Sequence, residues 1–151
     1  MIKKQRTKTG MIIAASGYFN PLHVGHLEYL EMAKKLADKL GGRLIVVVNN
    51  DKQVKLKGGH QFMNEKDRLK IIRALKCVDK AVLSIDTDKT VCRSLAKLKP
   101  NIFAKGGDRT SKEIPERAIC SRLGIAIVDR LGKKTRASSE IIKRAKKMKI
   151  I

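Results

Sequence analysis

Short apolar runs alternate with helix-like patterns along the 151-residue chain. The runs predict strands, because a strand that is covered on both faces reads as a continuous apolar, β-branched segment. These predicted strands are Met11–Ala15, Leu44–Val48, Lys80–Ile85, Asn101–Ala104 and Ile125–Val128. Between them, apolar residues recur every three or four positions, as on the buried face of a helix. Helices are therefore predicted at His23–Leu40, Asn64–Lys76, Thr87 or Asp88 to Leu98, Ile114–Leu123, and from Ser138 or Ser139 onward.

This strand–helix alternation, repeated five times, predicts the fold class. Connections long enough to hold a helix join parallel strands and cover both faces of the sheet. We therefore expect a single-domain α/β fold, Rossmann-like, with a five-stranded parallel sheet and helices on both faces. Residues 10–151 would form this domain and residues 1–9 a flexible basic arm. The polar segment Asn49–Met63 is expected to be a loop.

Composition restricts the class of protein. Hydrophobic residues make up 42% of the chain and aromatic residues 3%, so the core must be aliphatic. The three cysteines, Cys77, Cys92 and Cys120, lack the spacing of a metal site and are expected to be reduced thiols. No apolar run reaches the ~20 residues of a membrane helix. We expect a cytoplasmic protein with no membrane partner.

The net charge of +21 favours anionic partners. Residues 1–10 carry four Lys or Arg and no acid, and residues 130–151 carry nine with one acid. Such a field attracts nucleotides and also nucleic acid. Nucleic acid is possible but not favoured, because the chain lacks an aromatic stacking set and a known nucleic-acid motif.

The candidate chemistry lies directly after the first predicted strand. His23 and His26 are three residues apart at the start of a helix, so both imidazoles would lie on one face. The first turn of a helix also offers free N–H groups and a partial positive charge, and this combination suits a phosphate. Gly25 removes a side chain that would keep a ligand away from the turn. The alternatives are a surface pair or half of a zinc site, but His60 is the only other histidine, so a metal site has too few obvious ligands.

The segment from Gly17 to His26, GYFNPLHVGH, resembles the glycine-x-phenylalanine-Asp/Asn and His-x-Gly-His signature of cytidylyltransferase-like nucleotidyltransferases. Position 18 is Tyr where that family usually has Thr or Ser, and Asn20 replaces the commoner Asp. The resemblance continues in KGGD at residues 105–108, as in the ADP-heptose-synthase branch, and in RASSE at residues 136–140. It covers about residues 11–145.

The resemblance implies roles for individual residues. His23, His26, and Lys55 or Lys57 would be catalytic, and Arg68 would bind the acceptor. The nucleotide would be bound by Gly17, Tyr18, Phe19, Gly25, Lys105, Gly106, Gly107, Asp108, Arg136, Ser138 and Ser139. No protein ligand to a metal is implied, because Mg²⁺ would arrive with the nucleotide.

The reaction implied is transfer of a nucleoside monophosphate from CTP or ATP to a small phosphorylated polyol or sugar, with release of pyrophosphate. A mononucleotide acceptor is an alternative, and relatives are often homodimers. The residues themselves exclude two other nucleotide sites, since the chain has neither a G-x-x-x-x-G-K-[ST] loop nor a G-x-G-x-x-G fingerprint. The hypothesis from another class is a non-catalytic, basic nucleic-acid-binding protein on the same fold.

Overall fold

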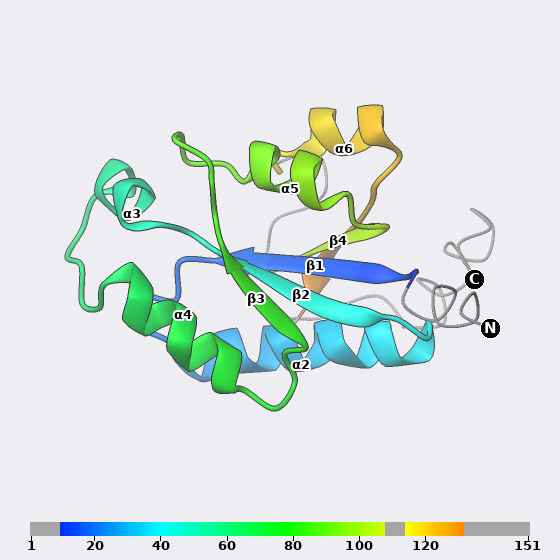
Figure 1. Ribbon diagram of the computed structural model, residues 1–151, viewed down its shortest axis with the longest axis horizontal. Coiled ribbons are helices and arrows are strands. Elements are labelled where there is room, and N and C mark those ends of the chain that lie inside the picture. The colour runs from blue at the N-terminus through cyan, green and yellow to red at the C-terminus, as the bar shows by residue number, and fades with distance from the viewer. Residues whose placement is uncertain (1–9, 108–113, 132–151) are drawn as a thin grey trace.

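The computed structural model describes residues 10–107 and 114–131, which form a five-stranded parallel sheet with helices on both faces (Figure 1). The strands are β1 (Ile12–Gly17), β2 (Arg43–Val48), β3 (Lys80–Leu83), β4 (Ile102–Gly106) and β5 (Ala126–Leu131). The helices are α2 (Val24–Lys39), α3 (Asp51–Lys57), α4 (Glu65–Ala74), α5 (Cys92–Leu98) and α6 (Arg117–Leu123). The predicted single-domain, Rossmann-like fold class is confirmed.

The strand order, β3-β2-β1-β4-β5, contains one reversal of direction. The chain moves outward from β1 to β2 and β3, then returns to place β4 on the other side of β1. The connections after β1 and β4 lead to opposite faces of the sheet, since α2 follows one and α6 the other (Figure 1). Such a switch point opens a crevice at the carboxyl ends of the two strands, where ligands of this fold bind.

Two apolar clusters hold the helices to the sheet. Helices α2 and α4 cover one face and α5 and α6 the other (Figure 1). Alternate residues of β1 point to opposite faces, so Ile13 and Ala15 belong to the first cluster and Ala14 to the second. In β2, all of Leu44–Val48 is buried, which explains why this strand reads as an unbroken apolar run.

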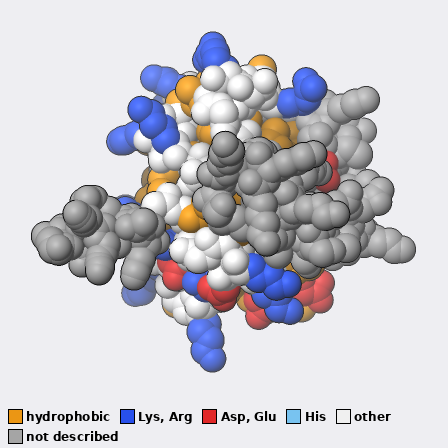
Figure 2. Space-filling view, turned by 90° about the vertical axis from the view of Figure 1, so that its right-hand side faces the viewer, with side chains coloured by type: hydrophobic (Ala, Val, Ile, Leu, Met, Phe, Trp, Pro, Cys, Tyr) orange, Lys and Arg blue, Asp and Glu red, His pale blue; other side chains and the backbone are white. Residues whose placement is uncertain are grey.

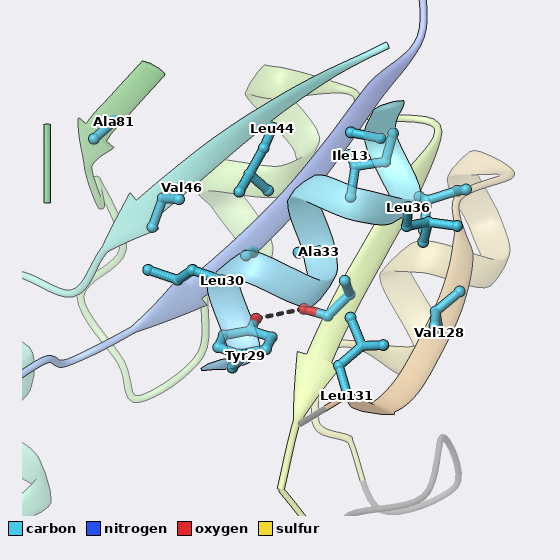
Figure 3. Packing of buried hydrophobic residues seen from close by; sticks show 14 of the residues in the cluster. Ile13, Tyr29, Leu30, Ala33, Leu36, Leu44, Val46, Ala81, Val128 and Leu131 are labelled. Atoms are coloured by element: carbon cyan, nitrogen blue, oxygen red, sulfur yellow. Dashed lines mark hydrogen bonds between the residues drawn. The ribbon is translucent and has the colours of Figure 1, made fainter. Parts of the chain in front are cut away.

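Tyr29 of α2 fixes the helix to the junction of β1 and β4. Its hydroxyl donates to the carbonyl of Ala104 (Figure 3). The same hydroxyl accepts the N–H of Ser16 at 3.2 Å. Gly106 makes room for this ring, because a Cβ at Gly106 would lie 2.8 Å from Cδ1 of Tyr29. Burial raises the pKa of the Tyr29 hydroxyl, which therefore stays protonated. The start of α2 is thus fixed relative to the switch point.

The prediction that Asn49–Met63 is a loop was wrong, because this segment contains α3. Asn50 and Gln53 form a capping box: the Asn50 side chain accepts the N–H of Gln53 at 2.9 Å, and the Gln53 side chain accepts the N–H of Asn50 at 3.0 Å. Only Gln53 and Val54 of this helix are buried, so it shows no apolar periodicity.

Two helix starts also differ from the prediction. α5 begins at Cys92, since Asp88 forms a turn with Thr90 and the buried carboxylate of Asp86 accepts the N–H groups of Arg93 and Ser94. α6 begins at Arg117 and not at Ile114. Its predicted end at Gly124 is confirmed, with a φ of 73° that suits glycine.

The predicted arm at residues 1–9 and the last basic helix lie outside the described residues, as do Asp108, Arg136, Ser138 and Ser139. Within residues 10–107 and 114–131, no helix is both long and apolar enough to cross a membrane.

Candidate active site

The first turn of α2 is closed by its two histidines. His23 is the N-cap residue, and its Nδ1 accepts the N–H of Gly25 at 3.1 Å. His26 completes the exchange, since its Nδ1 accepts the N–H of His23 at 3.1 Å. This is a capping box in which imidazole nitrogens take the place of the usual oxygens.

The capping box assigns the proton on each imidazole. Because both Nδ1 atoms accept backbone N–H groups, the neutral rings carry their protons on Nε2. The two ring centroids are 3.8 Å apart and the rings are tilted by 31°. Two Nε2–H donors therefore lie side by side at the N-terminus of a 16-residue helix, where the helix dipole adds positive potential.

His26 is a neutral donor at physiological pH. Burial, with smaller contributions from the charges of His23 and Lys57, lowers the pKa of His26 to about 4. The edge of the ring also packs against Phe19, with centroids 5.1 Å apart at 75°. The neutral His26 ring therefore has one donor, its Nε2–H, to offer to a phosphate.

Two glycines in this segment make room for side chains of the segment itself. A Cβ at Gly25 would lie 3.0 Å from Cε1 and 3.2 Å from Nδ1 of His23. A Cβ at Gly17 would lie 2.7 Å from Cζ of Phe19, which is buried and has a φ of 51°. The immediate effect of Gly25 is thus on the His23 ring, whereas the sequence had suggested room for a ligand.

Arg68 of α4 is fully buried and makes four hydrogen bonds next to the histidine turn. Its side chain donates to the carbonyls of Met63 at 3.0 Å, Tyr18 at 2.9 Å and Asn49 at 2.6 Å, and to Oδ1 of Asp51 at 2.8 Å. A buried guanidinium is tolerated because these acceptors compensate for its lost hydration. Since these contacts engage the guanidinium inside the protein, they favour a positioning role. Contact with the acceptor stays a prediction.

Asn20 joins the histidine turn to the segment between α3 and α4. Its Nδ2 donates to the carbonyl of His60 at 2.8 Å, and its Oδ1 accepts the N–H groups of Phe62 at 2.8 Å and Met63 at 3.2 Å. An aspartate could accept both N–H groups but could not donate to His60. The departure from Asp at this position therefore has a physical reason.

The two candidate lysines lie in the last turn of α3. Lys57 places its Nζ 4.3 Å from the centroid of the Tyr18 ring. Lys55 is exposed, and on a helix it projects about 200° away from Lys57. The start of α3 is fixed by buried Gln53, whose Nε2 donates to the carbonyls of Asp88 at 2.7 Å and Thr90 at 2.8 Å.

The end of β4 meets the histidine turn at the switch point, because β1 and β4 are paired in parallel. Lys105 extends from β4 with its Nζ 5.6 Å from the ring centroid of Phe103. Gly107 follows with a φ of 77°, a left-handed conformation that glycine adopts readily. The structure thus brings the predicted residues 17–26 and 105–107 to the same edge of the sheet.

A family model of cytidylyltransferase-like proteins matches residues 14–148, nearly the whole chain. The chain belongs to the cytidylyltransferase-like family of nucleotidyltransferases. This agrees with the family that the histidine segment resembles.

Relatives of this nucleotidyltransferase have two different sizes. Bifunctional protein HldE of Streptomyces coelicolor is 40% identical over 121 residues, which are 79% of this chain and 25% of that protein. FAD synthase of Methanothermus fervidus is 33% identical over 141 residues, 89% of this chain and 94% of that protein. The crystal structure of a lipopolysaccharide core biosynthesis protein from Thermoplasma volcanium matches with a TM-score of 0.66 and 32% identity, covering 82% of this chain and 97% of that one.

Sequence reasoning missed several groups around the candidate site. Asp51 and Gln53 were assigned to a loop, although the Asn50-x-x-Gln53 spacing is a capping signal. Glu116 was also missed: its Oε2 accepts the N–H of Val91 at 2.9 Å, while its Oε1 is buried without a partner. Its charge helps to raise the pKa of Tyr18, after the larger effect of burial.

Proposed function

We propose that the protein transfers a nucleoside monophosphate from ATP or CTP to a small phosphorylated acceptor and releases pyrophosphate. The observation that carries this proposal is the histidine capping box, which directs two Nε2–H donors from one helix N-terminus at the switch point. Phosphate is the ligand that such an arrangement suits best, because N–H donors and the helix dipole act on the same point.

The chemistry is a direct displacement. An oxygen of the acceptor phosphate attacks the α-phosphorus in line, the bond from the α-phosphorus to the bridging oxygen breaks, and pyrophosphate leaves with that oxygen. His23 and His26 donate hydrogen bonds to the phosphates as negative charge shifts in the transition state. A lysine of α3 adds a positive charge. No covalent intermediate with the enzyme is required.

Further residues are proposed to bind the rest of the nucleotide. Arg136, Ser138 and Ser139 would hold the β- and γ-phosphates, and the segment 105–108 would lie along the nucleotide. Mg²⁺ is part of the substrate, bound by the phosphate oxygens and water. The histidines suit this scheme as donors, because both Nδ1 lone pairs already accept backbone N–H groups.

The relatives support ATP as the donor. The FAD synthases of Methanothermus fervidus and Pyrococcus abyssi have nearly the same length as this chain, which covers 94% and 90% of them. An enzyme that makes FAD joins an adenylyl group to a flavin mononucleotide. We therefore propose adenylyl transfer first, with flavin mononucleotide and phosphosugars as the acceptor classes to test, and CTP as the alternative donor.

Labelled nucleotides test this reaction. With an α-³²P-labelled nucleotide and an acceptor, the label should move into the acceptor product. With a γ-³²P label, it should appear in pyrophosphate. A γ-label recovered in the acceptor would show phosphoryl transfer in place of nucleotidyl transfer, and would overturn the mechanism.

The net charge of +21 supports nucleic-acid binding as a second candidate. On the face shown in Figure 2, Lys and Arg side chains are dispersed, with acidic side chains beside them on the side of α2. Binding through the basic ends should fall steeply with salt and disappear when residues 1–9 and 146–151 are removed. Nucleotide turnover should largely survive the same truncation.

A further inference from the structure

Tyr18 and Lys57 come from different segments and meet beside the histidine turn. Tyr18 follows β1, and Lys57 is the last residue of α3. The Nζ of Lys57 lies 4.3 Å from the ring centroid, within the range of a cation–π interaction. The contact therefore joins the turn after β1 to the last turn of α3, which carries both candidate lysines.

The buried Arg68 side chain links Tyr18 to the start of the helix that carries Lys57. Nη1 of Arg68 binds the carbonyl of Tyr18, and Nη2 of Arg68 binds Asp51 in the first turn of α3. The guanidinium thereby sets the distance between the turn and the helix. Arg68 thus anchors the backbone of Tyr18 and the Asp51 side chain at the start of α3, whereas Lys57 itself is exposed.

Helix geometry separates Lys57 from Lys55. Lys57 lies three residues after Val54 and four after Gln53, the two buried residues of α3, so it projects from the inward side. Lys55 projects from the outward side. Lys57 is also close enough to His26 that its charge contributes to lowering the pKa of that imidazole. Of the two lysines, Lys57 is the one that the helix turns toward the histidines.

We propose that the ring face of Tyr18 holds the ammonium of Lys57 beside His26, so that Tyr18 is the positioning residue for the lysine that neutralises phosphate charge. The proposal rests on the proposed function for the role of that charge. It assigns the catalytic contact to Lys57 and leaves Lys55 on the solvent side.

An aromatic face suits this task better than a carboxylate. The ring attracts the ammonium through its quadrupole but accepts none of its three N–H groups in a strong hydrogen bond. The donors therefore remain available to phosphate oxygens. A carboxylate would hold the ammonium more tightly and cancel the charge that the triphosphate needs. At an exposed site the ring is expected to change the lysine's occupancy by about two- to five-fold.

Proton NMR of the whole chain tests the contact. The ε-methylene protons of Lys57 should show an upfield ring-current shift that Y18F retains and Y18L removes. The same protons of Lys55 should not change in either variant. An unshifted Lys57 in the wild-type protein, or a shift that persists in Y18L, would overturn the contact.

Binding and kinetics test the role. Affinities for Mg-ATP and Mg-CTP, and kcat and KM for the active pair, are compared among wild type, Y18F, Y18L, K57A, K55A and Y18L/K57A. Y18F and K55A should stay within about two-fold of wild type, while Y18L should lose about two- to five-fold. K57A should lose more, and Y18L should add nothing in the double variant. Multiplicative losses, or equal effects of K57A and K55A, would overturn the proposal.

The two proposals fail in different ways. If no acceptor supports turnover, the proposed reaction fails, but nucleotide binding and the ring-current shift still decide the role of Tyr18. If turnover occurs and Y18L behaves like Y18F, the reaction stands and the positioning role fails.

Discussion

The β1–α2 turn and the end of α3 both bring donor groups to the carboxyl edge of the sheet, but hydrogen bonds fix them to different degrees. In the turn, both histidine Nδ1 atoms are engaged and Asn20 makes three hydrogen bonds to the next segment. The last turn of α3 is exposed and runs into Gly58 and Gly59, with φ values of 89° and 90°. The difference indicates preorganised imidazole donors beside an adjustable cation.

The largest effect on turnover is expected from the histidines of the β1–α2 turn, the more firmly held of the two regions. His23→Ala and His26→Ala should each lower kcat by about 100-fold or more, because each removes a donor aligned with developing phosphate charge. Steady-state kinetics with His60→Ala as the matched histidine control measures this. Turnover near that of the wild type in both variants would show that the capping box serves only the helix.

Removing the guanidinium of Arg68, which connects the two regions, should destabilise the protein. Arg68→Met leaves the Asp51 carboxylate and three carbonyls without their donor, so we expect a loss of about 3 kcal/mol or more in the free energy of unfolding. Urea unfolding measures it, with exposed Arg73→Met as control. Equal stabilities of the two variants would contradict the anchoring role.

Adding one methyl group at Gly25 should reduce activity without reducing stability. Gly25→Ala places a Cβ 3.0 Å from the His23 ring and should reduce kcat by about ten-fold through the displaced donor. The free energy of unfolding should not fall, since alanine favours a helix by ~0.5–1 kcal/mol over glycine. The control is Val24→Ala, at a residue that is 69% exposed. Parallel losses of activity and stability would point to general misfolding.

The smallest effect concerns pH. Because the pKa of His26 is lowered from 6.5 to about 4, mainly by burial, the unfolded chain binds a proton that the folded chain does not. His26 should therefore favour folding above about pH 6.5, and this contribution should decline as the pH falls toward about 4. Urea unfolding at several pH values should show a shallower decline in His26→Gln, which keeps an acceptor for the His23 N–H. Identical slopes would refute the shift.

The sequence-based predictions succeeded where local patterns decide the structure. The strand at Leu44–Val48 is apolar because both of its faces are covered, and Gly124 ends a helix because it adopts positive φ. α3 was missed because its signal is a capping box and not an apolar stripe. Arg68 could not be interpreted from its neighbours in the chain, since its partners extend back to Tyr18, 50 residues away. The choice between Lys55 and Lys57 likewise needed the helix that carries them.

The most direct test is pyrophosphate release from ATP and from CTP, each measured with Mg²⁺ and with flavin mononucleotide, phosphosugars and phosphopolyols in turn. The account predicts release that requires both one nucleotide and one acceptor, and that His23→Ala abolishes while His60→Ala does not. Acceptor-independent release, or no release together with no binding of either nucleotide, would contradict it.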